Sequence, residues 1–154
     1  MPNIYNSIQG NIGFGKAIEY FTSQGIPVSI PLNDTQKYDL IADFNGGLQR
    51  ISIKTSRFSK NGTSYEVVLK NSGGSSGKSV IRKFDNTSCD YVFIYTANED
   101  LYLIPTNQIQ ALNAIVVGNK YTEFKVKIKT LIGHCIIFKK LKNAAVNVFK
   151  KIII

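Results

Sequence analysis

Two stretches in the first third of the chain alternate between apolar and polar residues, as strands with one buried face do. Residues 38–44 set Asp39 on the face opposite to their aromatic and leucine side chains. Residues 48–55 set Ser52 and Lys54 together on one face. We therefore predict two consecutive strands whose polar side chains share one side of a sheet.

A tight hairpin turn is expected between these strands, because the glycines at 46–47 tolerate the positive φ angles that such turns need. With these two glycines as the loop, Asp39 lies directly opposite Lys54, and Ile41 lies opposite Ser52. Directly opposed residues on one face have Cβ atoms about 5 Å apart, so the acid and the amine are predicted to meet. A slip of one residue would send them to different faces.

A helix is predicted upstream, because four apolar residues follow the spacing of a single helix face: Phe14, Ala17, Ile18 and Phe21. Asn11 has a side chain suited to cap the start of this helix, and Gly25 is suited to end it. Glu19 lies at the border of the apolar face, from which its carboxylate can lean toward a neighbouring sheet. A short extended segment follows and stops at Pro31.

The later chain is predicted to add more strands. These are expected at residues 64–70, 90–96, 101–104 and 124–129, with a short helix that Thr106 or Asn107 could cap. Residues 71–79 are rich in glycine and serine and are predicted to form a flexible loop.

The composition fits a single domain, residues 1–154, with 44% hydrophobic residues available for a core. A formal charge of +9 favours a polyanionic partner, either nucleic acid or a membrane surface. The charge is concentrated in residues 120–154, a basic part expected to contact DNA or to mediate oligomerisation. No apolar run could span a bilayer, no secretory signal opens the chain, and Cys89 and Cys135 have no metal or disulfide spacing. We expect a cytoplasmic protein.

An acid beside a lysine suits the hydrolysis of a phosphodiester. Asp39 can hold Mg²⁺ through hard carboxylate oxygens, and the backbone carbonyl of Ile53 and the carboxylate of Glu19 can add ligands. The metal would polarise the phosphate and activate a water, while the Lys54 amine steadies charge or orients that water. His134 is the single histidine, so a nucleophile triad is not expected. The alternative interpretation is a surface salt bridge between Asp39 and Lys54, which stabilises a hairpin little.

Four stretches resemble the PD-(D/E)XK nuclease superfamily, and within it the group I intron-encoded homing endonucleases: residues 13–20, 28–31, 38–43 and 50–55. By this resemblance Asp39 is the metal-binding acid, Lys54 the active-site lysine and Glu19 the acid of the helix. The resemblance implies an α/β restriction-endonuclease-like core, with a mixed, mainly antiparallel sheet flanked by helices. It also implies Mg²⁺, for which Mn²⁺ substitutes, and double-stranded DNA that is cut at a specific site.

Two residues depart from the pattern of this superfamily. Tyr38 stands where the family name expects proline, at a position known to vary. Ser52 stands where the second acid usually lies, and a serine would bind a metal weakly or through water. Glu66 on the next predicted strand, or Asp43 on the face of Asp39, could supply the missing carboxylate.

The expected partner is double-stranded DNA, and six basic residues are candidate contacts to it: Lys16, Arg57, Lys60, Lys78, Arg82 and Lys83. A small chain that reads a long site usually works as a symmetric oligomer, so a homodimer or homotetramer is expected, with the apolar residues 152–154 as a candidate interface. One alternative function is a Holliday-junction resolvase of the same fold. Another is a non-catalytic nucleic-acid-binding module on a nuclease scaffold, which Ser52 makes plausible.

Overall fold

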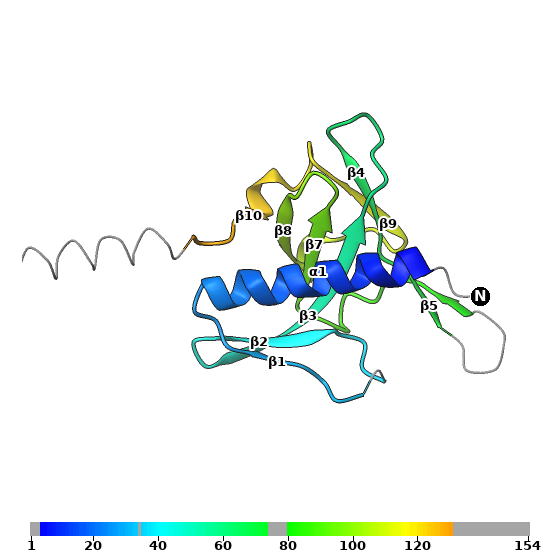
Figure 1. Ribbon diagram of the computed structural model, residues 1–154. Coiled ribbons are helices and arrows are strands. Elements are labelled where there is room, and N and C mark those ends of the chain that lie inside the picture. Colours follow the sequence, from blue (N-terminus) through cyan, green and yellow to red (C-terminus); the bar gives the residue numbers. More distant parts are fainter. Residues whose placement is uncertain (1–3, 34, 74–79, 131–154) are drawn as a thin grey trace, which may run out of the picture.

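A mixed six-stranded sheet with one long helix against it forms the centre of the structure (Figure 1). The structure is a computed structural model, and it describes residues 4–33, 35–73 and 80–130. The strands lie in the order β1-β2-β3-β7-β8-β10. Their bounds are Val28–Ser29 for β1, Leu40–Phe44 for β2, Gly47–Ser56 for β3, Tyr91–Thr96 for β7, Leu101–Pro105 for β8 and Lys125–Val126 for β10. Lys78 and residues 131–154, which include His134, Cys135 and the apolar end, lie outside the described residues.

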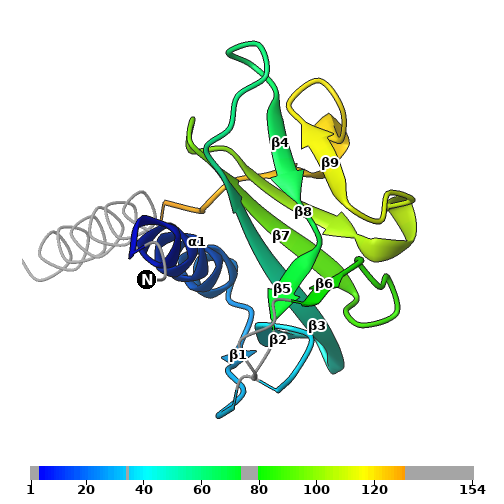
Figure 2. The same ribbon diagram turned by 90° about the vertical axis from the view of Figure 1, so that its right-hand side faces the viewer.

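The two faces of this sheet enter two separate cores. On one face, α1 (Ile4–Ser23) buries Ala17, Tyr20 and Phe21 among side chains of β2, β3 and β7. On the other face, a small sheet of β4 (Tyr65–Val68) and β9 (Ala114–Val117) buries Val67 and Val117 with side chains of β7 and β8. Figure 2 shows α1 on one side of β3 and β7, and β4 and β9 on the other. The mixed sheet with a flanking helix confirms the predicted fold class, but in the described residues a small sheet, not a second helix, covers the second face.

Most strands lie where the alternation predicts them, and the differences fall in short elements. The four-residue β9 escaped the sequence argument because so short an apolar run has no readable period. The predicted loop at 71–79 includes β5 (Asn71–Gly73), which pairs with β6 (Val80–Arg82). The helical residues after β8 form the short 3₁₀ helix Thr106–Gln108, and a second one, Thr122–Phe124, precedes β10. In the part of the chain that the structure describes, no helix is long and apolar enough to cross a membrane.

Helix α1 is longer than the sequence predicts. It includes Ile4, so Asn11 lies inside the helix and does not cap it. Its end agrees with the prediction: Gly25 has a φ of +74°, and the N–H of Ile26 donates to the carbonyl of Phe21 over 2.9 Å. This is the left-handed termination that glycine permits. The turn directs the chain back along the sheet into β1.

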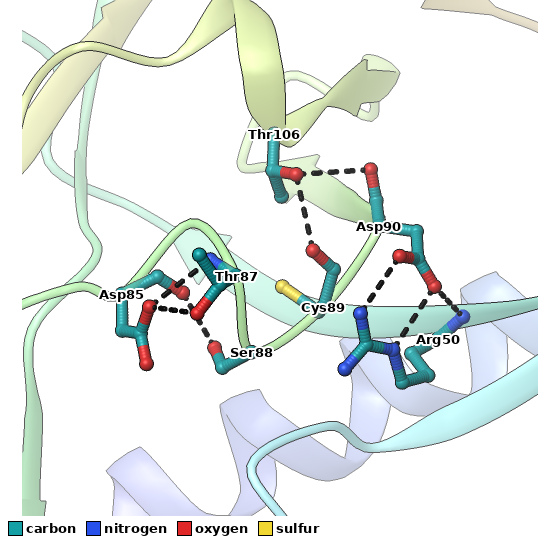
Figure 3. Close-up of polar contacts among 7 residues, drawn as sticks. All are labelled: Arg50, Asp85, Thr87, Ser88, Cys89, Asp90 and Thr106. Atoms are coloured by element: carbon teal, nitrogen blue, oxygen red, sulfur yellow. Dashed lines mark hydrogen bonds and ion pairs between the residues drawn. The ribbon is translucent and has the colours of Figure 1, made fainter.

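Strand β3 runs parallel to β7 and antiparallel to β2, so it is held on both edges. At the start of the parallel pair, Asp90 binds Arg50 three times (Figure 3). Its Oδ2 accepts from the Arg50 backbone N–H over 2.7 Å and from Nε over 3.1 Å, and its Oδ1 accepts from Nη2 over 2.9 Å. The backbone N–H of Asp90 donates in return to the Arg50 carbonyl over 2.8 Å. We call this set of bonds the Arg50–Asp90 clamp.

A buried threonine directly after β8 bonds to the backbone at the clamp. The hydroxyl of Thr106 donates to the carbonyls of Cys89 and Asp90, over 3.0 and 3.2 Å (Figure 3). The Cys89 thiol is buried, and this burial raises its pKa, so it stays neutral. The clamp therefore fixes the position of β3 against β7 and β8 immediately before residues 51–54.

We expect Asp90→Asn to lower the free energy of unfolding by about 1 to 2 kcal/mol, because it weakens charge-assisted hydrogen bonds to a side chain that remains in place. The Arg50 side chain holds the pKa of the Asp90 carboxyl below its ordinary value. The stabilisation is thus complete above the ordinary carboxyl pKa and is lost as pH falls through the lower folded-state pKa.

Urea unfolding at several pH values measures this effect. The parent should lose stability in acid, and the variant should lose less. Glu19→Gln is the matched control, since it breaks an exposed ion pair with Lys16 and should change stability little. Equal stability of parent and Asp90→Asn at neutral pH would contradict a stabilising clamp.

Candidate active site

The hairpin of β2 and β3 is closed by Asn45 and Gly46, not by the two glycines. Both residues have positive φ, 53° and 92°, and Phe44 pairs with Gly47. An asparagine–glycine pair is the preferred sequence for such a turn, because both central positions require left-handed backbone. The register is therefore shifted by two residues from the predicted one. Asp39 does not lie opposite Lys54.

The shift gives Asp39 a different partner on β3, but the side chains of both strands stay on the faces predicted for them. Leu40 pairs with Ile51, and Ile41 pairs with Arg50 rather than Ser52. Asp39 directly precedes β2, so its position corresponds to that of Ser52 on β3. Because side chains alternate with a period of two, a two-residue shift keeps Ser52 and Lys54 on the same face of β3.

That face is the one covered by β4 and β9. Ser52 pairs with Val92 and Lys54 with Ile94 across the parallel ladder. Val92 and Ile94 belong to the core under β4 and β9, and residues paired across a ladder share a face. The side chains of Ser52 and Lys54 therefore lie at the edge of this apolar core.

The carboxylate of Asp39 binds two neighbours on β3. Its Oδ2 accepts a hydrogen bond from the Ser52 hydroxyl over 3.3 Å and from the Ile53 backbone N–H over 2.5 Å. Carbonyl and N–H of one strand residue point to the same edge, so the Ile53 carbonyl also points toward the side of β2. The carboxylate of Asp39 thus lies beside the hydroxyl and the backbone of two adjacent residues of β3, Ser52 and Ile53.

Lys54 is partly buried on this face. Burial lowers the pKa of its amine below the ordinary value, and the nearby Asp39 carboxylate opposes that shift. A lysine in such surroundings gives up its proton more readily than an exposed lysine. It can therefore take part in proton transfer as well as hold negative charge.

A hollow of about 360 Å³ lies over these residues, and it has seven lining residues: Gln36, Lys37, Asp39, Ser52, Ile53, Lys54 and Lys70. The sequence argument did not find Lys37 and Lys70. Lys37 lies in the connection before β2, where its amine is 3.2 Å from Asp85. Lys70 follows β4, and its backbone N–H is bound to Asn113 over 3.2 Å. Only the fold brings Lys70 to a hollow whose carboxylate, Asp39, lies 31 positions earlier in the chain, because the small sheet crosses above β3.

Glu19 is not part of this hollow, which corrects the expectation that its carboxylate leans toward the strand residues. Its side chain is 51% exposed, and Oε2 lies 2.9 Å from the Lys16 amine. The helix that carries it covers the face of the sheet opposite to Ser52 and Lys54. The apolar stripe of α1 is centred on Tyr20 and Ala17, which turns Glu19 toward solvent.

The two alternative acids also lie elsewhere. Glu66 is between the buried residues Tyr65 and Val67 on β4, so it points away from the core, and its Oε2 lies 2.9 Å from the Lys60 amine. Asp43 accepts the Gly46 N–H over 2.7 Å at the far end of β2. The described residues contain no group of three or more His, Cys, Asp or Glu side chains that could hold a metal. The hollow therefore has one carboxylate, Asp39, among its lining residues.

The predicted DNA contacts are spread over several surfaces. Lys16 lines a separate hollow of about 420 Å³ with residues of β8 and β10. Arg57 lines another, of about 210 Å³, beside the N-terminal half of α1. Lys60 is bound to Glu66, while Arg82 and Lys83 are exposed at the end of β6. None of these described residues lines the Asp39 hollow, although Arg82 pairs with Asn71, which directly follows the lining residue Lys70.

We expect Lys54→Met to raise the free energy of unfolding by about 1 kcal/mol, as replacements of strained site residues commonly do. The amine is charged in a place that disfavours charge, and methionine keeps the length of the side chain. The parent should approach the variant in stability as pH rises through the lowered lysine pKa, since the penalty disappears when the amine is neutral. Thermal unfolding from neutral to alkaline pH measures both effects. A variant that unfolds at a lower temperature than the parent would contradict this account.

Known proteins show the same fold and family. Over residues 6–131 the sequence matches the family described as PD-(D/E)XK endonuclease. A solved structure of a bacterial homing endonuclease, I-Ssp6803I, is similar with a TM-score of 0.63 and 22% sequence identity, over 90% of this chain and 95% of that one. At this identity the structural match shows a common fold. No curated protein matches the sequence. Because the family match spans most of the chain and includes the Asp39 hairpin, the protein belongs to the PD-(D/E)XK endonuclease family.

Proposed function

We propose that this protein is a Mg²⁺-dependent endonuclease that cuts both strands of DNA at a specific site, in the manner of a homing endonuclease. The observation that carries the proposal is the meeting of Asp39, Ser52, the Ile53 backbone and Lys54 in one hollow. The family match and the structural similarity to a homing endonuclease support it. The charge of +9 suits a polyanionic substrate.

The donor atoms of the hollow fit a hard divalent cation. Asp39 and the Ile53 carbonyl would hold Mg²⁺, and the Ser52 hydroxyl would bind it weakly or through water. Mg²⁺ is commonly bound by one or two carboxylates together with waters and substrate phosphate, so a single acid is sufficient. When bound, the metal supplies polarisation of the phosphate and a more acidic water. Mn²⁺ has the same preference for oxygen ligands and is expected to substitute.

Residues of β3 position the Asp39 carboxylate and handle the proton and the charge of the reaction. The Ser52 hydroxyl and the Ile53 N–H hold the Asp39 carboxylate in place, which fixes where its oxygens point. The Lys54 amine, with its lowered pKa, accepts or relays a proton at the attacking water and then holds the charge that develops on the phosphate. Replacement of Asp39 or Lys54 should therefore lower the rate of cleavage more than the affinity for DNA.

Lys37 and Lys70 give the hollow an excess of positive charge. With Lys54 they make three of the lining residues lysines against one carboxylate, Asp39, although the Lys37 amine lies 3.2 Å from Asp85. Because Ser52 replaces a second acid, the hollow has one negative charge fewer, and the repulsion of a phosphate is weaker. We propose that Lys70 binds a backbone phosphate next to the one that is cut, in the role of a positioning contact.

Cutting both strands requires two hollows, so the functional unit is expected to be a homodimer or a homotetramer. The second candidate function is a DNA-binding module without catalysis, which the single carboxylate of the hollow favours. A junction-cutting enzyme of the same fold is distinguished from a site-specific one by its substrate.

The decisive experiment incubates the purified protein with linear, supercoiled and four-way-junction DNA, with Mg²⁺ and with EDTA. Cleavage of duplex DNA that requires Mg²⁺ is expected. Asp39→Asn and Lys54→Met should each lower the rate at least about 100-fold, because each removes a group that acts at the reacting phosphate. Glu99→Gln, at an exposed turn, is the matched control and should cut like the parent.

Binding without cleavage in every condition would replace the nuclease proposal with the non-catalytic one. Cleavage confined to the junction would replace it with the resolvase. Full activity of Lys54→Met would overturn the role given to that amine.

A separate prediction concerns Lys70. In an Asp39→Asn background, which prevents cutting, Lys70→Gln should weaken DNA binding several-fold and reduce the slope of log affinity against log salt by about one. Lys120→Gln removes the same charge at an exposed position outside the hollow and should have a smaller effect. Fluorescence anisotropy at several salt concentrations measures both variants. Equal effects of the two substitutions would contradict a specific phosphate contact.

A further inference from the structure

A second hollow lies directly beside the Asp39 hollow. It has a volume of about 360 Å³, and its lining residues are Pro31, Leu32, Asn33, Gln36, Tyr38 and Asp39. Asp39 and Gln36 also line the Asp39 hollow, so the two hollows meet at the carboxylate. We call the second one the Leu32 hollow. The candidate metal-binding acid therefore lies between two adjacent hollows.

The two hollows differ in charge. The Asp39 hollow has three lysines among its lining residues, whereas the Leu32 hollow has no cation among its own and only the shared carboxylate. The other lining side chains of the Leu32 hollow are apolar, aromatic or amide groups. A phosphate is attracted to lysines, while the uncharged sugar and base of a nucleotide suit a surface without cations. The two hollows therefore suit different parts of one nucleotide chain.

Leu32 is an apolar side chain that the fold leaves fully exposed. Its exposed fraction is 105%, the highest among the large apolar side chains in the described part of the chain. Contacts within the chain therefore do not explain a leucine at this position. A single exposed leucine is common on protein surfaces, but this one lies in the wall of a hollow that adjoins the candidate active site.

The walls opposite Leu32 are held by the rest of the chain. The Tyr38 side chain packs against the core under β4 and β9. The Thr35 hydroxyl donates to Oδ1 of Asn33 over 2.7 Å, which orients that amide. Tyr38 is also the residue that stands where the family name expects proline. This departure from the family pattern thus gives the Leu32 hollow an aromatic wall.

A DNA strand whose phosphate lies at Asp39 must continue past that carboxylate. Successive phosphates of one strand are one base pair apart, about 3.4 Å along the helix axis. The nucleotide next to the phosphate therefore lies beside Asp39, where the Leu32 hollow is. In proteins that bind the minor groove, leucine is one of the apolar residues inserted between base steps, and asparagine and glutamine read base edges.

We propose that the Leu32 hollow is a nucleoside subsite, which takes the sugar and base next to the phosphate at Asp39, with Leu32 in contact with that base. Leu32 contributes to the affinity for DNA and to the placement of the strand, and it takes no part in proton transfer. The proposal rests on the proposed function for the position of the phosphate, but it concerns binding and does not require cleavage.

The first test follows the leucine methyl signals of the full chain by NMR while a DNA duplex of mixed sequence is added. The chain carries Asp39→Asn, which prevents cutting, and Leu32→Ile identifies the Leu32 signals by their loss. The Leu32 signals should shift on addition of DNA. Leu48 and Leu112 are the matched controls, because they are 68% and 51% exposed and line neither hollow, and their signals should shift much less.

The second test measures the affinity for the same duplex by fluorescence anisotropy at several salt concentrations. Leu32→Ser should weaken binding at least about threefold, because it removes an apolar contact, and Leu32→Met should bind like the parent. The slope of log affinity against log salt should stay unchanged in Leu32→Ser, since the contact involves no charge. Leu48→Ser is the control and should bind like the parent. The melting temperature should not change in any of these variants, because both leucines are exposed.

The outcomes separate this proposal from the proposed function. DNA that binds without moving the Leu32 signals more than those of Leu48 would overturn the nucleoside subsite alone. Leu32 signals that shift with protein concentration and not with DNA would assign the hollow to a second copy of the chain and overturn it as well. A duplex that does not bind would overturn both proposals. Leu32 signals that shift on addition of DNA, while the protein with Asp39 intact cuts no DNA with Mg²⁺, would support the subsite and contradict only the nuclease.

Discussion

The position of β3 is the constraint on which the rest of the structure depends. The Asn45–Gly46 turn sets its register against β2, and the Arg50–Asp90 clamp sets its register against β7. Ile51, Ser52, Ile53 and Lys54 follow immediately, and they supply a core residue, a hydroxyl, a backbone carbonyl and an amine. Because the strand is held on both edges, these groups meet the Asp39 carboxylate in one fixed arrangement. A rigid strand of this kind places reacting groups more accurately than a loop can.

Alternate residues of β3 serve the core and the candidate site, because they point to opposite faces of the sheet. Odd positions such as Ile51 and Ile53 face α1 and enter its core, whereas Ser52 and Lys54 face the small sheet. The consequence is a lysine at the rim of an apolar core, where burial lowers its pKa and lowers stability. A charged group kept in such a place is typical of a functional site, because packing alone would favour an apolar residue there. The family match agrees with this interpretation.

Several features followed from local patterns and several did not. Alternation identified the strands and their polar face, and Gly25 identified the end of α1, because both depend on neighbouring residues only. The predicted register of the hairpin, and with it the partner of Asp39, was wrong by two residues. Three turn-forming residues in a row, Asn45 to Gly47, allow more than one loop. Glu19 was expected at the site because the predicted apolar face of α1 included Ile18, next to Glu19. The buried face of the helix instead includes Tyr20, and Glu19 points to solvent, where it pairs with Lys16. Lys37 and Lys70 were missed because single lysines carry no pattern.

The sequence by itself determined that Asp39, Ser52 and Lys54 belong to one surface. The side-chain period of a strand is two, so this result survives a two-residue error in register. The tertiary structure alone decided which face of the sheet that surface is and what else reaches it. Strand β4 crosses above β3 and brings Lys70 to the hollow, while α1 covers the other face and keeps Glu19 away. These relations join residues far apart in the chain through the packing of two cores, and no local period along the sequence encodes them.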